Sequence, residues 1–248
     1  MVRAQPDLPP IVVHVEDVHK TYGTGTISTP VLNGVNLTVH RGECVYLAGP
    51  SGSGKTTLLS ILGCILSADR GKVQILDQDV LALDPQGRVA MRLHRIGFVF
   101  QRFHLIRGLT ALGNVCVPLT LRGISRRGAS QRAAALLEAV GLAGKENFHP
   151  KNLSAGQCQR VALARALVGD PELILADEPT ASLDANNGRE AMELLRRLAA
   201  EQGRTLIVVT HDQRIFRYAD RIFWLENGRV AETRESGSSP SSPESGSP

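Results

Sequence analysis

The sequence has little of several features that mark particular classes of protein. It contains only four cysteines among 248 residues, with no C-x-x-C pair and no histidine at metal-ligand spacing. A disulfide framework or a structural zinc site is therefore not expected. No apolar run approaches the roughly 20 residues of a membrane-spanning helix, and the first residues do not lead into a hydrophobic leader. We expect a chain that stays in the cytosol unless a partner holds it, with reduced and mostly buried cysteines. They are Cys44, Cys64, Cys116 and Cys158.

The sequence also lacks a strong charge of either sign, because its formal net charge is +4. A mild basic excess can accompany nucleic acid or an anionic membrane surface, but a solvated basic face explains it as well, and we favour the second interpretation. The densest basic cluster, at Arg122–Arg132, is interrupted by glycine and serine and is predicted to be a surface loop. No internal repeat is evident, so one copy of each motif below is expected to act.

Composition divides the chain into a folded body and two loose ends. Residues 1–10 carry three prolines and are predicted to be a loose lead-in. Residues 232–248 are rich in serine, proline, glycine and glutamate, and such a segment buries too little apolar surface to offset its ordering entropy. The folded body is then expected at residues 11–231. The chain is 42% hydrophobic, which suffices for one α/β domain with an inserted subdomain.

Short apolar runs alternate with helical patterns along this body. A helix is predicted at Lys55–Leu66, and another between residues 191 and 198, where apolar residues recur on one face. Apolar runs between helices are typical of strands covered on both faces, so a mostly parallel, doubly wound sheet is expected. The predicted strands are Ile11–Val15, Gly34–Val39, Cys44–Ala48, Lys72–Leu76, Ile96–Phe100, Leu173–Ala176 and Leu206–Thr210.

Residues 101–152 interrupt this alternation. They contain no convincing strand, and Ala133, Leu136, Leu137 and Val140 repeat with helical spacing. We therefore expect a helical subdomain at about residues 101–168, inserted into the α/β core.

A phosphate-binding loop directly follows the predicted strand Cys44–Ala48. The segment matches G-x-x-x-x-G-K-[ST] between a strand and a helix, the context that the motif requires. Glycines let backbone N–H groups approach phosphate oxygens, Lys55 is placed to meet the β- and γ-phosphates, and Thr56 offers a hydroxyl to Mg²⁺. The expected nucleotide-binding residues here are Gly49, Pro50, Ser51, Gly52, Ser53, Gly54, Lys55, Thr56 and Thr57.

Two adjacent carboxylates end the predicted strand Leu173–Ala176. Successive side chains of a strand point to opposite sides, so Asp177 and Glu178 cannot do the same work. Asp177 suits Mg²⁺ or its bound water, whereas Glu178 can act as general base on a water aligned with the γ-phosphate. Gln101 and His211 follow two further predicted strands. Because ligands of open α/β sheets lie beyond the carboxyl ends of the strands, these four side chains are expected to converge, with His211 contacting the γ-phosphate.

The segment Leu153-Ser154-Ala155-Gly156-Gln157 first indicates a well-capped helix, because Ser154 and Gln157 have capping-box spacing. Followed by Cys158-Gln159-Arg160-Val161-Ala162, it also resembles the signature motif of ABC ATPases. Nearly all of residues 11–232 resembles that family, with its elements in the same order. The resemblance implies an α/β P-loop NTPase fold of the ABC ATPase type, with a mostly parallel core, antiparallel N-terminal strands and the helical insertion.

The resemblance also implies roles for individual residues. Tyr22 resembles the aromatic residue that stacks on adenine, Gln101 the Q-loop glutamine that also serves Mg²⁺, and His211 the switch histidine. In this family the signature helix of one subunit completes the ATP site of a second. Ser154, Gly156 and Gln157, with Asp184 of the D-loop, are therefore expected at the nucleotide of a second copy, in an ATP-sandwich homodimer. Ala155 departs from the usual glycine; we expect activity to survive, and the tightness of dimer closure is what it puts in doubt.

Within the family, the sequence is most similar to the MacB/LolD/DevA-like group, on cues that include Ile96–Phe103, Leu109–Val115 and Val209–Ile215. The implied activity is ATP hydrolysis, with ATP and Mg²⁺, coupled to an integral membrane permease in an exporter or extraction system. A periplasmic adaptor can belong to such systems. The chain is then expected at the cytoplasmic face of the inner membrane, held through the permease. The transported substrate is not encoded in these motifs.

Two other functions remain as alternatives. The chain could signal through a permease in cell-envelope processes without transport, and nothing in the sequence excludes this. It could also be a soluble ABC protein that acts on nucleic acid. The compact insertion between Gly49 and Ser154 and the single ATPase domain argue against that alternative, so no nucleic acid is expected as partner.

Overall fold

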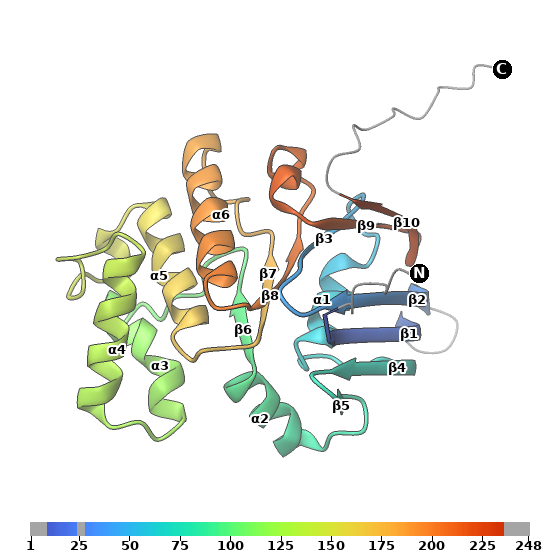
Figure 1. Cartoon of the computed structure of the whole chain (residues 1–248), viewed down its shortest axis with the longest axis horizontal. Coiled ribbons are helices and arrows are strands. Elements are labelled where there is room, and N and C mark those ends of the chain that lie inside the picture. The colour runs from blue at the N-terminus through green and yellow to red at the C-terminus, as the bar shows by residue number, and fades with distance from the viewer. Residues whose placement is uncertain (1–8, 24–27, 236–248) are drawn as a thin grey trace, which may run out of the picture.

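A computed structural model describes residues 9–23 and 28–235, and it gives side-chain environments through residue 230. Two sheets form the frame of this part of the chain (Figure 1). The larger sheet has the strand order β10-β9-β3-β8-β7-β6, and the smaller has the order β2-β1-β4-β5. The fold is the α/β architecture that the sequence predicts.

The six-stranded sheet is parallel except at one edge. Strands β6, β7, β8, β3 and β9 run in the same direction, whereas β10 pairs antiparallel with β9. Every residue of β3 and β8 is buried, as expected of strands covered on both faces. The strands are β3 (Cys44–Ala48), β6 (Ile96–Val99), β7 (Leu173–Asp177), β8 (Thr205–Val209), β9 (Arg221–Glu226) and β10 (Arg229–Glu235).

The four-stranded sheet is antiparallel throughout. Its first two strands have 12 residues each, whereas the sequence predicts only Ile11–Val15 and Gly34–Val39 as strands. Register shifts along both strands allow the pairing to continue. One shift lies between Val15 and Val18, where Asp17 takes a positive φ of 46°. The strands are β1 (Ile11–Tyr22), β2 (Thr29–His40), β4 (Arg70–Ile75) and β5 (Gln78–Asp79).

The helices divide into those of the core and those of the insertion. Helices α3, α4 and α5 lie together at one end of the molecule, away from the four-stranded sheet (Figure 1). Residues 101–152 hold helices and no strand, as predicted. The α-helices are α1 (Lys55–Leu62), α2 (Pro85–His94), α3 (Ala111–Leu121), α4 (Arg126–Ala139), α5 (Ala155–Leu167) and α6 (Ala185–Ala200), and two 3₁₀ turns are η1 (Pro150–Asn152) and η2 (Gln213–Tyr218).

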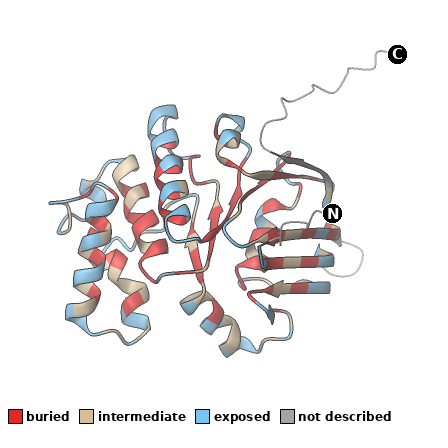
Figure 2. Ribbon diagram, in the orientation of Figure 1, coloured by how far each residue is buried: buried red, intermediate tan, exposed pale blue. Residues whose placement is uncertain are grey.

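Two hydrophobic clusters lie on opposite faces of the six-stranded sheet. One contains alternate residues of β3, β7 and β8 together with α3 to α6. The other contains the intervening residues of the same strands with α1, β1, β2 and β4. Buried residues accordingly run through the centre of both sheets, and exposed residues gather on the outer helix faces (Figure 2). The parallel strands are thus held from both sides, which fixes the position of the loops at their ends.

Three sequence-based boundaries need correction. The first helix ends at Leu62, four residues early, because Gly63 caps it and Cys64 has a positive φ of 54°. The basic cluster is not a loop throughout, since Ser125 caps a helix that begins at Arg126. Strand β10 continues to Glu235, beyond the predicted boundary at 231, because its backbone pairs with β9 without needing apolar side chains. Most of the predicted lead-in and residues 236–248 of the predicted disordered tail lie outside the described residues.

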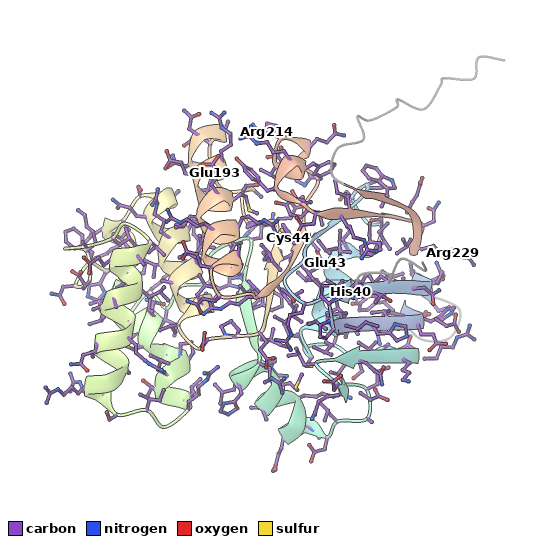
Figure 3. All side chains as sticks on the ribbon, viewed as in Figure 1. His40, Glu43, Cys44, Glu193, Arg214 and Arg229 are labelled. Atoms are coloured by element: carbon purple, nitrogen blue, oxygen red, sulfur yellow. The ribbon has the colours of Figure 1, made fainter. Side chains whose placement is uncertain are left out.

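Within residues 9–23 and 28–235, no helix combines the length and the apolar character that crossing a membrane requires. The four cysteines are free, and three of them are buried, as predicted. One of these, Cys44, begins β3 near the middle of the molecule, whereas Glu193 of α6 and Arg214 of η2 lie at an outer edge (Figure 3).

Candidate functional site

A cavity of about 660 Å³ lies at the carboxyl ends of the parallel strands. The loops that follow β3, β6, β7 and β8 all contribute to its wall, so the predicted convergence of these strand ends is present in the structure. The cavity is lined by Tyr22, Val31, Gly49, Pro50, Ser51, Gly52, Gly54, Lys55, Thr56, Thr57, Gln101, Glu178 and His211.

The loop between β3 and α1 forms a cradle that tolerates no extra atoms at two positions. Gly49 has a φ of +140°, and a Cβ there would lie 2.0 Å from the carbonyl oxygen of Leu225. Gly54 has a φ of +102°, and a Cβ there would lie 2.8 Å from the carbonyl oxygen of Val31. Ser53, 5% exposed, carries a buried hydroxyl that has no hydrogen-bond partner among the described residues. An unpartnered buried hydroxyl in a glycine-rich loop fits a phosphate oxygen.

Lys55 lies within this cradle, with only 7% of the residue exposed. Its ammonium group donates to the carbonyl oxygens of Gly49, at 2.9 Å, and of Pro50, at 2.7 Å. Desolvation lowers the pKa of Lys55, and the nearby carboxylates Glu178 and Asp177 oppose that shift. A buried ammonium that meets backbone carbonyls is poised to exchange them for anionic oxygens.

The Thr56 hydroxyl donates to Asp177 Oδ1 at 3.2 Å, and these two oxygen groups come from α1 and β7. Burial raises the pKa of Asp177; the hydrogen bond from Thr56 counteracts this shift. Oxygen ligands are those that Mg²⁺ prefers, and Mg²⁺ commonly takes one or two protein groups with substrate phosphates and water. The donor set therefore fits Mg²⁺.

Glu178 and His211 meet across the cavity wall. His211 Nδ1 lies 2.7 Å from Glu178 Oε1, a hydrogen bond between the loops that follow β8 and β7. The Glu178 side chain is 13% exposed, whereas that of His211 is 69% exposed. Glu178 also has a positive φ of 46°, a conformation that is costly for a residue with a Cβ and that persists where the surroundings impose it. This strained backbone lies at a residue that lines the cavity.

Gln101 and Tyr22 also line the cavity. Gln101 follows β6, and its main-chain oxygen accepts a hydrogen bond from Ser182 Oγ at 3.1 Å. Tyr22 ends β1 and is 45% exposed, with the Lys20 ammonium 5.9 Å from its ring centroid. An exposed aromatic ring at a cavity mouth can stack on a planar base.

The four residues predicted to serve a second copy do not line this cavity. Ser154 caps α5, and the predicted capping box with Gln157 is present, at 3.2 Å and 3.0 Å. A Cβ on Gly156 would lie 2.8 Å from Asn187 Oδ1, and the Asn187 side chain in turn donates to Asp184 at 2.6 Å. Ser154, Gly156, Gln157 and Asp184 thus belong to one surface that is separate from the cavity lining.

Some site residues were not predicted from the sequence. Val31 of β2 lines the cavity, and a single valine in a strand carries no signal that would identify it. Ser182 belongs to the segment that resembles the D-loop, but its hydrogen bond to the main chain of Gln101, which links the loops after β6 and β7, was not predicted. The direct hydrogen bond between Glu178 and His211 was also not predicted, because the sequence indicates only that both follow strands. Ser53 and Asp177, both predicted, lie beside the cavity without being part of its lining.

Comparisons with known proteins identify relatives of this arrangement. A family profile described as ABC transporter matches residues 32–181. The macrolide export ATP-binding/permease protein MacB of Sodalis glossinidius is 44% identical over 224 residues, covering 90% of this chain and 34% of that protein. MacB of Escherichia coli is 43% identical over 219 residues, covering 88% of this chain and 34% of that protein. The chain thus spans about a third of the length of the curated relatives it matches.

Solved structures agree with these sequence relatives. The dimeric post-hydrolysis structure of the ATP-binding cassette MJ0796, bound to ADP and Pi, is 41% identical with a TM-score of 0.84, covering 91% of this chain and 99% of that one. CbiO1 of Clostridium perfringens, part of the ABC transporter complex cbiONQ, is 29% identical with a TM-score of 0.83. The match covers 92% of this chain and 89% of that one. Profile, relatives and structures together confirm the predicted fold and family: the chain belongs to the ABC transporter family.

Proposed function

We propose that the chain hydrolyses ATP as one of two identical subunits that drive a membrane permease. The observation that carries this proposal is the cavity in which a phosphate cradle, an oxygen donor pair and a carboxylate–histidine pair meet at the ends of four parallel strands. The MJ0796 cassette, 41% identical, was solved as a dimer bound to ADP and Pi, which supports the same reaction here.

The nucleotide would be held chiefly by the loop after β3. Its backbone N–H groups, the Ser53 hydroxyl and Lys55 bind the phosphates, and Tyr22 stacks on the adenine. Thr56, Asp177 and Gln101 would hold Mg²⁺. When bound, Mg²⁺ neutralises charge that develops on the phosphate oxygens.

Glu178 is the general base. Its carboxylate accepts a proton from a water aligned with the γ-phosphate, the water oxygen bonds to the γ-phosphorus, and the bond from that phosphorus to the bridging oxygen of ADP breaks. ADP and inorganic phosphate are the products. His211, hydrogen-bonded to Glu178 and largely exposed, contacts the γ-phosphate and keeps the carboxylate directed at the water.

Two copies complete each other's sites. Ser154 and Gly156 lie at the N-terminus of α5, where free backbone N–H groups and the helix dipole favour an anion. They are separate from the cavity of their own chain, so the phosphate they serve belongs to a second copy. Asp184 accepts a hydrogen bond from Asn187, which lies next to Gly156. Asp184 is therefore expected at the same interface between the two copies. ATP binding then joins the two copies, and hydrolysis releases them.

The permease partner is supported by the relatives and by a second groove. The MacB relatives are named ATP-binding/permease proteins, and about two thirds of their length lies outside the match. A groove of about 520 Å³ between α2 and α3 exposes Val89 and Leu121, which are 50% and 68% exposed. Its charged lining residues are Arg92, Arg122 and Arg165. An apolar groove with only basic charges fits a cytoplasmic segment of the permease that carries apolar and acidic side chains.

This partner would place the chain at the cytoplasmic face of the inner membrane, where a periplasmic adaptor can complete the transport system. Export or extraction of the substrate is the direction that similarity to MacB favours. The same similarity favours a permease over nucleic acid as the partner.

Nucleotide binding and turnover of three single variants test the assignment of ATP hydrolysis. Lys55→Ala should weaken nucleotide binding because the buried cation of the cradle is lost. Glu178→Gln should still bind MgATP but lose turnover by about 100-fold or more, since general bases contribute on the order of 10²–10⁴. Glu193→Gln removes a carboxylate that contacts Tyr218 and Arg217 on the outer edge and should retain wild-type turnover. Rapid hydrolysis by Glu178→Gln, or full binding by Lys55→Ala, would contradict the proposal.

A further inference from the structure

The loop that follows Gln101 has an unusual backbone. Phe103 and His104 are consecutive, and both have positive φ angles, of 59° and 45°. Left-handed conformations are unfavourable for residues with a Cβ, and two in succession are more so. Such a loop keeps its conformation only where neighbouring groups hold it.

Arg165 is the side chain that holds these two residues. It lies near the C-terminal end of α5, and its guanidinium donates to the carbonyl oxygen of His104 at 2.6 Å and to that of Phe103 at 2.6 Å. Desolvation lowers the pKa of Arg165, and none of the ion pairs among the described residues includes it. A partly buried guanidinium without a carboxylate partner satisfies its charge mainly through these two carbonyls, so the contact is not an incidental surface bond.

The same loop is fixed at two other points. Ser182 donates to the main-chain oxygen of Gln101 at 3.1 Å. The fully buried side chain of Asn114 accepts from the backbone N–H of Ile106 at 2.7 Å and donates to its carbonyl at 3.1 Å. The Arg165 contact differs from these two because it connects the loop to α5, the helix that begins at the signature segment.

We propose that Arg165 is a positioning residue for hydrolysis, which holds the loop after Gln101 in its left-handed conformation and joins it to the signature helix. The inference rests on the proposed function, because Gln101 serves the nucleotide only in a chain that hydrolyses ATP. Arg165 itself does not line the nucleotide cavity and acts through Gln101. Arg165 thereby ties the position of the Gln101 loop to that of α5, the helix that Ser154 caps.

Arg88 of α2 offers a matched control. Its guanidinium also binds two backbone carbonyls, those of Leu83 at 3.1 Å and Leu81 at 3.4 Å. It lines neither the nucleotide cavity nor the groove between α2 and α3. The carbonyls that Arg88 binds lie outside the Gln101 loop, so replacing it removes a comparable interaction without releasing that loop.

The test compares Arg165→Met, Arg165→Lys and Arg88→Met in the full chain. Arg165→Met should lower kcat for MgATP by about tenfold or more, because small misplacements of a catalytic group are costly, while its KM stays within about twofold of wild type. Arg165→Lys keeps the positive charge but loses the planar guanidinium that reaches both carbonyls, so its kcat should lie between those of wild type and Arg165→Met. Arg88→Met should keep wild-type kcat. Equal kcat in Arg165→Met and Arg88→Met would overturn the proposal.

A double-variant cycle separates positioning from general destabilisation. If Arg165 acts through Gln101, Arg165→Met should reduce kcat no further in a Gln101→Ala background, whereas independent effects would multiply and contradict the proposal. Amide hydrogen exchange gives a readout that does not need activity. Exchange at residues 101–109 should rise by about tenfold or more in Arg165→Met but not in Arg88→Met. Unchanged exchange would overturn the role of Arg165, whereas absence of turnover in the wild-type chain would contradict the proposed function instead.

Discussion

Replacing Asn114 with alanine is expected to destabilise the fold strongly, because this fully buried side chain makes all its hydrogen bonds to the backbone of the preceding loop. The side chain is 0% exposed, accepts from the Ile106 N–H and donates to the carbonyls of Ile106, Leu109 and Thr110. Its loss leaves the Ile106 N–H without this partner and removes hydrogen bonds worth about 1 kcal/mol each. The free energy of unfolding should therefore fall by about 3–5 kcal/mol, a large part of the typical 5–15 kcal/mol.

Urea denaturation followed by circular dichroism and by the fluorescence of Trp224, the single tryptophan, measures this change. Asn36→Ala is the matched control. Asn36 also bonds backbone groups, the N–H of Asp17 and the carbonyl of Gly34, but it is exposed, so water replaces the lost partners at a cost below about 1 kcal/mol. The reasoning would be refuted if Asn114→Ala lowered the free energy of unfolding no more than Asn36→Ala does, while the dependence of that free energy on urea concentration stayed unchanged.

Two further variants probe the cavity. Gly49→Ala should abolish nucleotide binding and lower the melting temperature, because its φ is +140° and its Cβ would meet Leu225, whereas Gly52→Ala, with nothing within 4 Å, should melt closer to wild type. Asp177→Asn should lose Mg²⁺-dependent turnover yet raise the urea midpoint at pH 7. Burial raises the Asp177 pKa above 3.8, so ionisation at neutral pH opposes folding. The stability gain should vanish below pH 3.8, where the carboxyl is protonated in both states; equal midpoints at pH 7 would contradict this.

The strongest sequence signals concerned backbone geometry at strand ends. The loop Gly49–Thr57 was predicted because its glycines satisfy steric demands that the structure makes visible at Gly49 and Gly54. The capping box at Ser154 was predicted for the same reason, since cap chemistry is local in sequence. Such features depend on a few neighbouring residues and survive in any tertiary context.

The features that were missed depend on distant parts of the chain. Helix α2 was not predicted, since only Met91 of it is buried and Gly87 within it disfavours a helix. Strand β9 was not predicted as a strand, although Ile222, Phe223 and Leu225 are buried within it, because its position beside β3 is a tertiary fact. The link from Arg165 to the Gln101 loop likewise joins residues more than 60 positions apart.

The central claim is that each nucleotide site is completed by a second copy, and the oligomeric state of Glu178→Gln tests it most directly. With MgATP bound and no hydrolysis to release the pair, light scattering should report a dimer, and a monomer when ATP is removed. Adding Gly156→Asp places a negative charge at the N-terminus of α5 and should leave an ATP-bound monomer, because the chain's own cradle is intact. A Glu178→Gln chain that stays monomeric at saturating MgATP, or a double variant that dimerises equally well, would contradict the account.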